Sequence, residues 1–156
     1  MKRIASIQDV SCLGRCSQTV ALPVVSAMGV ECAILPTAVL STHTSFPDFH
    51  CLDLTDQLLP VARHWKAQGV RFDALYTGYL ASDRQVAVVL ELLELLREEG
   101  TLLFVDPAMA DHGKLYAGFG PEFPALMAQV VSKAQITVPN ITEASLMTGL
   151  PYREDY

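Results

Sequence analysis

The stretch DALYTGYLASDRQVAVVLELLELLREEGTLLFVD, residues 73–106, contains one complete strand–helix–strand unit. Its two ends, 73–79 and 101–106, are short runs rich in apolar and aromatic residues, which favour strands. The segment 83–100 between them repeats apolar residues at helical spacing and ends in glycine. A helix that joins two strands in this way indicates a right-handed crossover within a parallel sheet.

The same alternation continues in both directions along the chain. We expect strands at 3–8, 30–36, 73–79, 101–106 and 136–140, and helices at 17–29, 54–69, 83–100 and 122–134. Ser17 predicts the start of the first helix, and Ser82 with Gln85 predicts a capping box on the third. The pattern indicates an α/β fold, with three αβα layers around a mostly parallel, Rossmann-like sheet of about five strands in a single domain, 1–156.

Composition narrows the possible partners. Hydrophobic residues make up 51% of the 156 residues and charged residues 18%, a balance that predicts a packed domain rather than disorder. The formal net charge of −6 argues against nucleic acid or an anionic membrane, because both attract basic surfaces. Neither a signal peptide nor an apolar stretch of membrane-spanning length stands out, so we expect a soluble, cytoplasmic protein.

The four cysteines are expected to be reduced thiols. Cys12 and Cys16 are four positions apart, which is not the spacing of a zinc knuckle or of a C-x-x-C redox pair. His43, His50 and Cys51 are close in sequence, but a zinc site would require a second paired spacing that the sequence lacks.

Polar and aromatic residues follow the predicted strands, where parallel sheets bind their ligands. They are Gln8, Asp9, Thr37, Gly78, Tyr79, Asp106, Asn140 and Glu143. The segment after the second strand, 37–50, is too long for a simple connection, and loops of this length usually carry function. Two carboxylates of the set, Asp106 and Glu143, are suitable ligands for Mg²⁺.

The segment VPNITEASLMTG, 138–149, allows two interpretations. Asn140 or Thr142 can cap a helix, and Glu143 in the first turn suits the positive end of the helix dipole. Alternatively, the same groups form part of a metal–phosphate site at the carboxyl end of a strand. The segment alone leaves both interpretations open.

Several common signatures are missing from the sequence. There is no G-x-G-x-x-G after the first strand and no G-x-x-x-x-G-K-[ST], which disfavours a dinucleotide dehydrogenase and a P-loop nucleotidase. There is also no G-x-S-x-G, the motif of an α/β hydrolase. GFGPE, 118–122, is interpreted as a turn because no strand precedes it.

Five segments together resemble the ribokinase-like superfamily and, within it, the pyridoxal/pyridoxamine (vitamin B6) kinases. They are SIQDV (6–10), STHT (41–44), TGYL (77–80), DPAMAD (106–111) and PNITE (139–143). Their order and spacing match across essentially the whole chain. The resemblance implies a ribokinase-like sheet truncated after about five strands, a homodimer, and transfer of the ATP γ-phosphoryl to the 5′-hydroxymethyl group of a B6 vitamer, with Mg²⁺.

The resemblance also implies roles for individual residues. Asp9, His43, Thr44 and Tyr79 are expected to line the vitamer pocket, and Asp9 departs from the serine that is common in the family. Around the nucleotide phosphates we expect Asp106, Asp111, Tyr116, Asn140 and Glu143, with Asp106 and Glu143 near the metal.

The catalytic aspartate of the family lies in a G-x-G-D segment, which the 156 residues do not contain. No residue present is therefore nominated as the catalytic base. We expect that base to lie beyond Tyr156 and the 156-residue chain alone to be inactive.

Two alternatives remain: a non-catalytic vitamer- or phosphate-binding module, and a phosphotransferase like the hydroxymethylpyrimidine kinases. The second is disfavoured because DVSCLGRCS, 9–17, is poor in glycine where those enzymes would be expected to show a glycine-rich loop.

Overall fold

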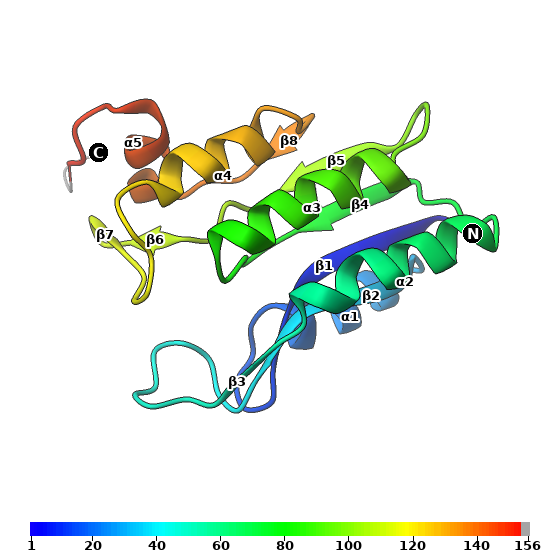
Figure 1. Cartoon of the computed structure of the whole chain (residues 1–156), viewed down its shortest axis with the longest axis horizontal. Coiled ribbons are helices and arrows are strands. Elements are labelled where there is room, and N and C mark those ends of the chain that lie inside the picture. Colours follow the sequence, from blue (N-terminus) through cyan, green and yellow to red (C-terminus); the bar gives the residue numbers. More distant parts are fainter. Residues whose placement is uncertain (154–156) are drawn as a thin grey trace.

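The computed structural model describes residues 1–153, in which a six-stranded sheet has the order β3-β2-β1-β4-β5-β8 (Figure 1). Five strands are parallel, and β3 at one edge is antiparallel to β2. The strands are β1 (Arg3–Ser11), β2 (Glu31–Leu40), β3 (Cys51–Asp53), β4 (Ala74–Thr77), β5 (Leu102–Val105) and β8 (Ile136–Thr137). The predicted α/β fold with a mostly parallel sheet is confirmed.

The helices of this part of the chain are α1 (Gln18–Ala27), α2 (Thr55–Ala67), α3 (Asp83–Leu96), α4 (Phe123–Val131) and α5 (Ile141–Thr148). In Figure 1, α2, α3 and α4 lie side by side over one face of the sheet, and α1 lies behind β1 and β2 on the other. None of the helices within residues 1–153 has the length and apolar character needed to cross a membrane.

The core lies between the sheet and helices α2, α3 and α4. Leu75, Leu103 and Val105 are fully buried on this side, whereas Tyr76 and Phe104 point to the opposite face and are half-buried. This alternation follows from the two-residue period of a strand. Apolar side chains of the three helices complete the core, among them Leu58, Val89, Leu92 and Met127.

Strands β1 and β2 extend further toward the carboxyl edge than the predicted ranges of 3–8 and 30–36. Their pairing continues as far as Ser11 and Leu40. Part of the segment predicted as a long loop, 37–50, therefore belongs to β2, and β3 then pairs back onto it. The sequence did not indicate this extension because it depends on pairing with a neighbouring strand.

The start of α1 differs from the prediction, because Ser17 does not cap the helix. Its φ of +49° lies outside the extended conformation of a capping residue, and its side chain accepts no capping hydrogen bond. Instead, Thr19 Oγ1 accepts a hydrogen bond of 3.2 Å from the backbone N–H of Cys16. At the other end, Gly29 has a φ of +76° and ends the helix as predicted.

Only half of the capping box predicted for α3 is formed. Ser82 Oγ accepts a hydrogen bond from the N–H of Gln85 at 3.2 Å, but Gln85 Oε1 accepts from the N–H of Ala81 instead of Ser82. The Gln85 amide also donates to the Thr37 carbonyl at 3.0 Å and to Thr55 Oγ1 at 2.9 Å. Because this side chain is fully buried, its polar groups need partners inside the protein, and they tie α3 to β2 and α2.

A short antiparallel hairpin after β5 was not expected from the sequence. It consists of β6 (Ala110–Asp111) and β7 (Lys114–Leu115). The two turn residues, His112 and Gly113, have φ values of +48° and +74°, and a two-residue type I′ turn requires positive φ at both positions. Thr142 Oγ1 accepts a hydrogen bond from the N–H of Gly113 at 2.9 Å, which holds the hairpin against α5.

Candidate functional site

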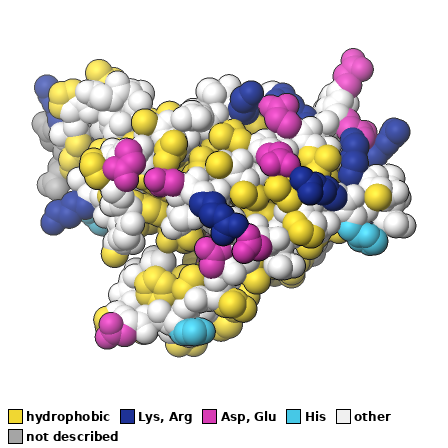
Figure 2. Space-filling view, viewed as in Figure 1, with side chains coloured by type: hydrophobic (Ala, Val, Ile, Leu, Met, Phe, Trp, Pro, Cys, Tyr) yellow, Lys and Arg dark blue, Asp and Glu magenta, His cyan; other side chains and the backbone are white. Residues whose placement is uncertain are grey.

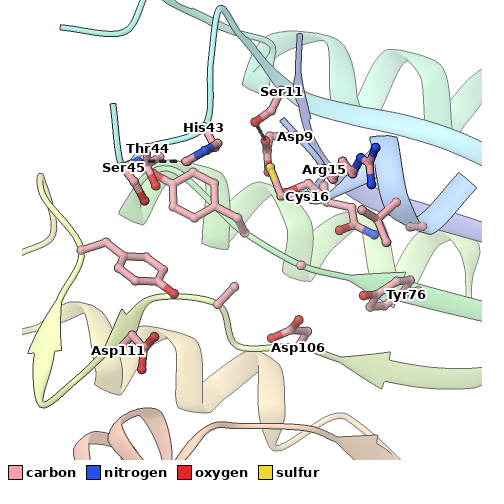
Figure 3. Close-up of a pocket in the computed structure, with 18 of the residues that line it drawn as sticks. Asp9, Ser11, Arg15, Cys16, His43, Thr44, Ser45, Tyr76, Asp106 and Asp111 are labelled. Carbon is pink, nitrogen blue, oxygen red and sulfur yellow. Dashed lines mark hydrogen bonds between the residues drawn. The ribbon is translucent and has the colours of Figure 1, made fainter. Parts of the chain in front are cut away.

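A cavity of about 1040 Å³ opens at the carboxyl edge of the sheet, among the ends of β1 and β4, the loop after β1, and the β6–β7 hairpin (Figure 3). Seven of the predicted site residues line it: Asp9, His43, Thr44, Tyr79, Asp106, Asp111 and Tyr116. Asn140 and Glu143 lie outside its lining. The structure therefore brings most of the predicted set together, although it comes from segments far apart in the sequence.

The lining residues fall into two groups on opposite sides of the cavity. Figure 3 shows Asp9, His43 and Thr44 on one side, and Asp106 with Asp111 on the other. The first group was predicted to hold a vitamer, and the second to lie near nucleotide phosphates. The cavity runs from β1 to the β6–β7 hairpin, so different elements of the fold line its two sides.

Asp9 lies where the β1–β2 register shifts: Gln8 and Val10 pair with Pro36 and Val39, so the extra residue belongs to β2 and Asp9 stands opposite it. Such β-bulges are common beside functional sites. The Asp9 side chain is almost completely buried, and its Oδ2 accepts a hydrogen bond of 3.1 Å from Ser11 Oγ. The end of β1 thus places a carboxylate in the wall of the cavity.

Tyr79 forms an aromatic part of the wall. Its ring lies 5.6 Å from that of Phe119, which in turn stacks on Phe123 at 3.9 Å. Burial, and then the nearby Asp9 carboxylate, raise the pKa of Tyr79 to about 12. The phenol therefore stays neutral at physiological pH and presents a flat, uncharged surface suited to a heteroaromatic ring.

His43 joins two loops over the same end of the cavity. Its ring packs edge-on against Phe46 with 4.8 Å between centroids, and its Nδ1 accepts a hydrogen bond from the N–H of Ser45 at 3.4 Å. A side chain at Gly14 would place Cβ only 2.8 Å from His43 Cδ2, so the loop after β1 approaches the ring closely. Gly14 also has a φ of +124°, which favours glycine.

Gly78 of the TGYL segment allows a second close approach. A Cβ there would lie 2.6 Å from Gln8 Oε1 and 3.2 Å from Gln8 Cβ. Gln8 is itself buried and donates a hydrogen bond of 2.8 Å to Ser6 Oγ. The glycine therefore lets the ends of β1 and β4 meet beneath the cavity.

Asp106 follows β5, and its N–H donates to the Thr77 carbonyl at 2.9 Å. Burial raises the pKa of its carboxyl above the usual range of an aspartate. Within residues 1–153 the carboxylate accepts no hydrogen bond and forms no ion pair. A half-buried carboxylate without a cation is chemically suited to bind one, so Asp106 fits the predicted Mg²⁺ ligand.

Asn140 and Glu143 form a complete capping box at the start of α5. Asn140 Oδ1 accepts from the N–H of Glu143, and Glu143 Oε2 accepts from the N–H of Asn140, both at 2.9 Å. The remaining groups reach the segment after β5: Asn140 Nδ2 donates to the Ala110 carbonyl at 2.7 Å, and Glu143 Oε1 accepts from the N–H of Met109 at 3.1 Å. The interpretation of this segment as a helix start is confirmed.

The metal role of Glu143 stays a prediction. Burial is the main cause of its raised pKa, and the Asp106 carboxylate contributes, which means that the two carboxylates are near each other. Both Glu143 oxygens already accept backbone hydrogen bonds, so a contact with Mg²⁺ would run through water. No cluster of three or more His, Cys, Asp or Glu suited to a metal occurs in the described part of the chain.

Asp111 and Tyr116 line the cavity beside the hairpin. Asp111 Oδ1 accepts a hydrogen bond from the N–H of His112 at 2.8 Å, and the same histidine lies 3.6 Å from Asp111 Oδ2. Burial, followed by the charges of Glu143 and Asp111, raises the pKa of Tyr116. The Tyr116 hydroxyl therefore remains protonated and able to donate a hydrogen bond to an anion.

The catalytic base is expected to lie beyond Tyr156, the last residue of the sequence. Tyr156 lies outside the described residues, 1–153. The expectation that the base lies beyond Tyr156 therefore stays a prediction.

Comparison with known proteins places this geometry in a family, although no family model matches the chain. A pyridoxine/pyridoxal/pyridoxamine kinase of Bordetella avium is 32% identical over 155 residues, which are 94% of this chain and 51% of the relative. A candidate phosphomethylpyrimidine kinase of Bacteroides thetaiotaomicron, in a crystal form with pyridoxal, is 42% identical with a TM-score of 0.94, covering 99% of this chain and 54% of that one.

A pyridoxal kinase of Leishmania donovani, in complex with ADP and pyridoxamine, has the same fold, with a TM-score of 0.82 at 23% identity over 96% of this chain and 55% of that one. The chain belongs to the pyridoxal kinase family. It spans about half the length of the relatives it matches and corresponds to their N-terminal part. The resemblance to a ribokinase-like B6 kinase, drawn from five short segments, is confirmed.

The lining residues that were not among the predicted site residues include two basic side chains and a thiol: Arg15, Lys114 and Cys16. Arg15 and Cys16 lie in the loop that follows β1, so their position after a strand was the available signal. Lys114 comes from the β6–β7 hairpin, whose presence the sequence did not indicate.

Proposed function

We propose that this chain forms the vitamer-binding and metal–phosphate part of an ATP-dependent kinase that phosphorylates the 5′-hydroxymethyl group of pyridoxal, pyridoxamine or pyridoxine. The observation that carries the proposal is the single cavity that joins Asp9, His43, Thr44 and Tyr79 to Asp106, Asp111 and Tyr116. Transfer of a phosphoryl group depends on holding donor and acceptor together and on neutralising charge.

The residues on the two sides of the cavity have different roles in this proposal. Tyr79 offers a flat wall to the pyridine ring, and Thr44 offers a hydroxyl group. On the other side, Asp106 would hold Mg²⁺ directly and Glu143 would hold it through water. The metal supplies charge neutralisation for the phosphates when it is bound. Asn140 positions this side by fixing the segment that contains Ala110.

Catalysis requires a group to accept the proton of the vitamer hydroxyl, and the G-x-G-D segment of the family is not among the 156 residues. A general base and an anion-stabilising site are each worth roughly 10²–10³-fold or more in rate. We therefore expect the 156-residue chain to bind ligands but to show no kinase activity at a family-like rate. ATP-dependent formation of pyridoxal phosphate by the purified chain, followed by absorbance, would contradict this expectation.

Because the 156 residues contain no G-x-G-D segment, a second candidate function for this chain alone is a non-catalytic module that binds a vitamer or a phosphate. A third candidate, a phosphotransferase like the hydroxymethylpyrimidine kinases, draws on the provisional name of the Bacteroides protein. Binding measurements separate these candidates from the first. The B6 proposal requires that pyridoxal binds more tightly than a hydroxymethylpyrimidine of the same size.

Tyr79 provides the sharpest test of the vitamer site. We expect Tyr79→Ala to weaken pyridoxal binding roughly tenfold, since the ring loses its aromatic wall. Tyr79→Phe is the matched control, because it keeps the ring and should bind pyridoxal as the unaltered chain does. Isothermal titration calorimetry measures all three proteins, and tighter binding of the pyrimidine than of pyridoxal would reject the B6 assignment.

A further inference from the structure

Asp9 has a buried carboxylate that forms no ion pair with a basic side chain within the described chain. Its side chain is 3% exposed, and the hydroxyl of Ser11 occupies Oδ2. The ion pairs among residues 1–153 join other groups and none includes Asp9, although Arg15 lines the same cavity. Buried charges in proteins are normally paired. The partner that the Asp9 carboxylate lacks within the protein can come from a bound ligand.

The Asp9 side chain faces the cavity. Asp9 is the residue at the register shift between Gln8 and Val10, and it lines the cavity beside Tyr79. Figure 3 shows it with Ser11 on the side of the cavity opposite Asp106. The free oxygen of Asp9, Oδ1, accepts no hydrogen bond from the described residues. It remains available to a donor in the cavity.

The surroundings offer no compensating positive charge in contact with Asp9 among the residues that the structure describes. Tyr79 is kept neutral, since burial and then Asp9 itself raise its pKa to about 12. His43 uses Nδ1 to accept a hydrogen bond from the N–H of Ser45 and forms no ion pair with Asp9. A ligand that brings a positively charged N–H group to this place would therefore meet an unpaired anion in a largely desolvated wall.

We propose that Asp9 binds a positively charged N–H group of the ligand and so determines which B6 vitamer this site prefers. The inference rests on the proposed function, because the vitamers offer two such groups. One is the ammonium of pyridoxamine, and the other is the protonated nitrogen of the pyridine ring. A charge-assisted hydrogen bond of this kind changes affinity by roughly ten- to hundredfold.

Titration calorimetry with pyridoxamine, pyridoxal and pyridoxine tests the proposal on the unaltered chain and on Asp9→Asn, Asp9→Ser and Asp83→Asn. The last is the matched control, because Asp83 is an exposed aspartate outside the cavity. If the ammonium is the partner, both Asp9 variants lose roughly ten- to hundredfold affinity for pyridoxamine alone. If the ring nitrogen is the partner, the affinities for all three vitamers fall together.

Unchanged affinities for all three vitamers in a folded Asp9 variant would overturn the inference and leave the proposed function standing. Failure of the unaltered chain to bind any vitamer would overturn both. If circular dichroism shows that both Asp9 variants are unfolded, measurements on the unaltered chain still test the proposal. Pyridoxine bound as tightly as pyridoxamine, with an ultraviolet spectrum of an unprotonated ring nitrogen, would exclude a role for Asp9 in binding a cation.

Discussion

At the level of single residues, two carboxylates of the cavity, Asp9 and Asp106, are buried or half-buried and form no ion pair within the described chain. Over helices α2, α3 and α4, Figure 2 shows basic side chains next to acidic ones, in agreement with ion pairs such as Arg63 with Glu91 and Lys133 with Glu94. Such exposed pairs contribute little to stability. Asp9 and Asp106 have no such partner within the described chain, and burial raises the pKa of the Asp106 carboxyl.

Asp106 should make stability depend on pH. Burial raises the pKa of its carboxyl in the folded protein, so the folded state holds the proton more tightly than the unfolded state. Protonation of the Asp106 carboxyl therefore stabilises the folded state. This stabilisation is present at low pH and is lost as the pH rises from the ordinary pKa of an aspartate, about 4, through the raised pKa of the folded protein. We expect Asp106→Asn, which cannot ionise, to gain in Tm relative to the unaltered chain between acidic and neutral pH.

Thermal unfolding followed by circular dichroism over this pH range measures the effect. Asp83→Asn, at the exposed start of α3, is the matched control for the change in charge. A difference in Tm between Asp106→Asn and the unaltered chain that stays constant with pH would show that the raised pKa does not matter for stability.

At the level of secondary-structure elements, buried polar side chains tie the helices to the sheet beneath the site. Gln85 connects α3 to the Thr37 carbonyl of β2 and to Thr55 of α2. Asn140 and Glu143 connect α5 to the segment after β5 in the same way. These contacts fix the distance between elements that carry the two sides of the cavity.

We expect Gln85→Ala to lower the free energy of unfolding by about 1–3 kcal/mol, since the Thr37 carbonyl loses its partner in the interior. The matched control is Gln57→Ala on the exposed side of α2, which should change stability by less than about 0.5 kcal/mol. Urea denaturation gives both values. Equal effects of the two substitutions would mean that the buried hydrogen bonds of Gln85 contribute nothing.

At the level of the whole molecule, the two faces of the sheet are covered unequally. Helices α2, α3 and α4 cover one face, whereas α1 covers only β1 and β2 on the other (Figure 1). On that second face Leu102 is 36% exposed and Ile136 is 44% exposed, and β8 forms an open edge of the sheet within the described residues. Apolar patches and open strand edges favour association.

We therefore expect the 156-residue chain to self-associate, in line with the homodimer anticipated from the sequence. Light scattering after size-exclusion chromatography should show a mass that increases with concentration. Leu102→Lys combined with Ile136→Lys should shift the chain toward monomer, whereas Leu13→Lys, at an exposed leucine in the loop after β1, should not. A monodisperse monomer at high concentration would contradict this prediction.

The amino-acid sequence by itself determined the order and type of the main elements and which residues follow the strands. Hydrophobic periodicity and helix-ending glycines such as Gly29 act within a few residues of the chain, so they can be read without neighbours. The same is true of the Asn140–Glu143 capping box, which the sequence offered as one of two interpretations.

Only the tertiary structure decided how the side chains of these residues are oriented and which partners they contact. Asp9 meets the other residues of the cavity only once β1 has paired with its neighbours, and the Gln85 amide finds its partners 30 and 48 positions away. The edge strand β3 likewise forms only by pairing with β2, and the β6–β7 hairpin is held in place by Thr142 of α5. Such contacts join segments distant in sequence, and the physical reason that local patterns miss them is that their free energy is gained only when the sheet has assembled.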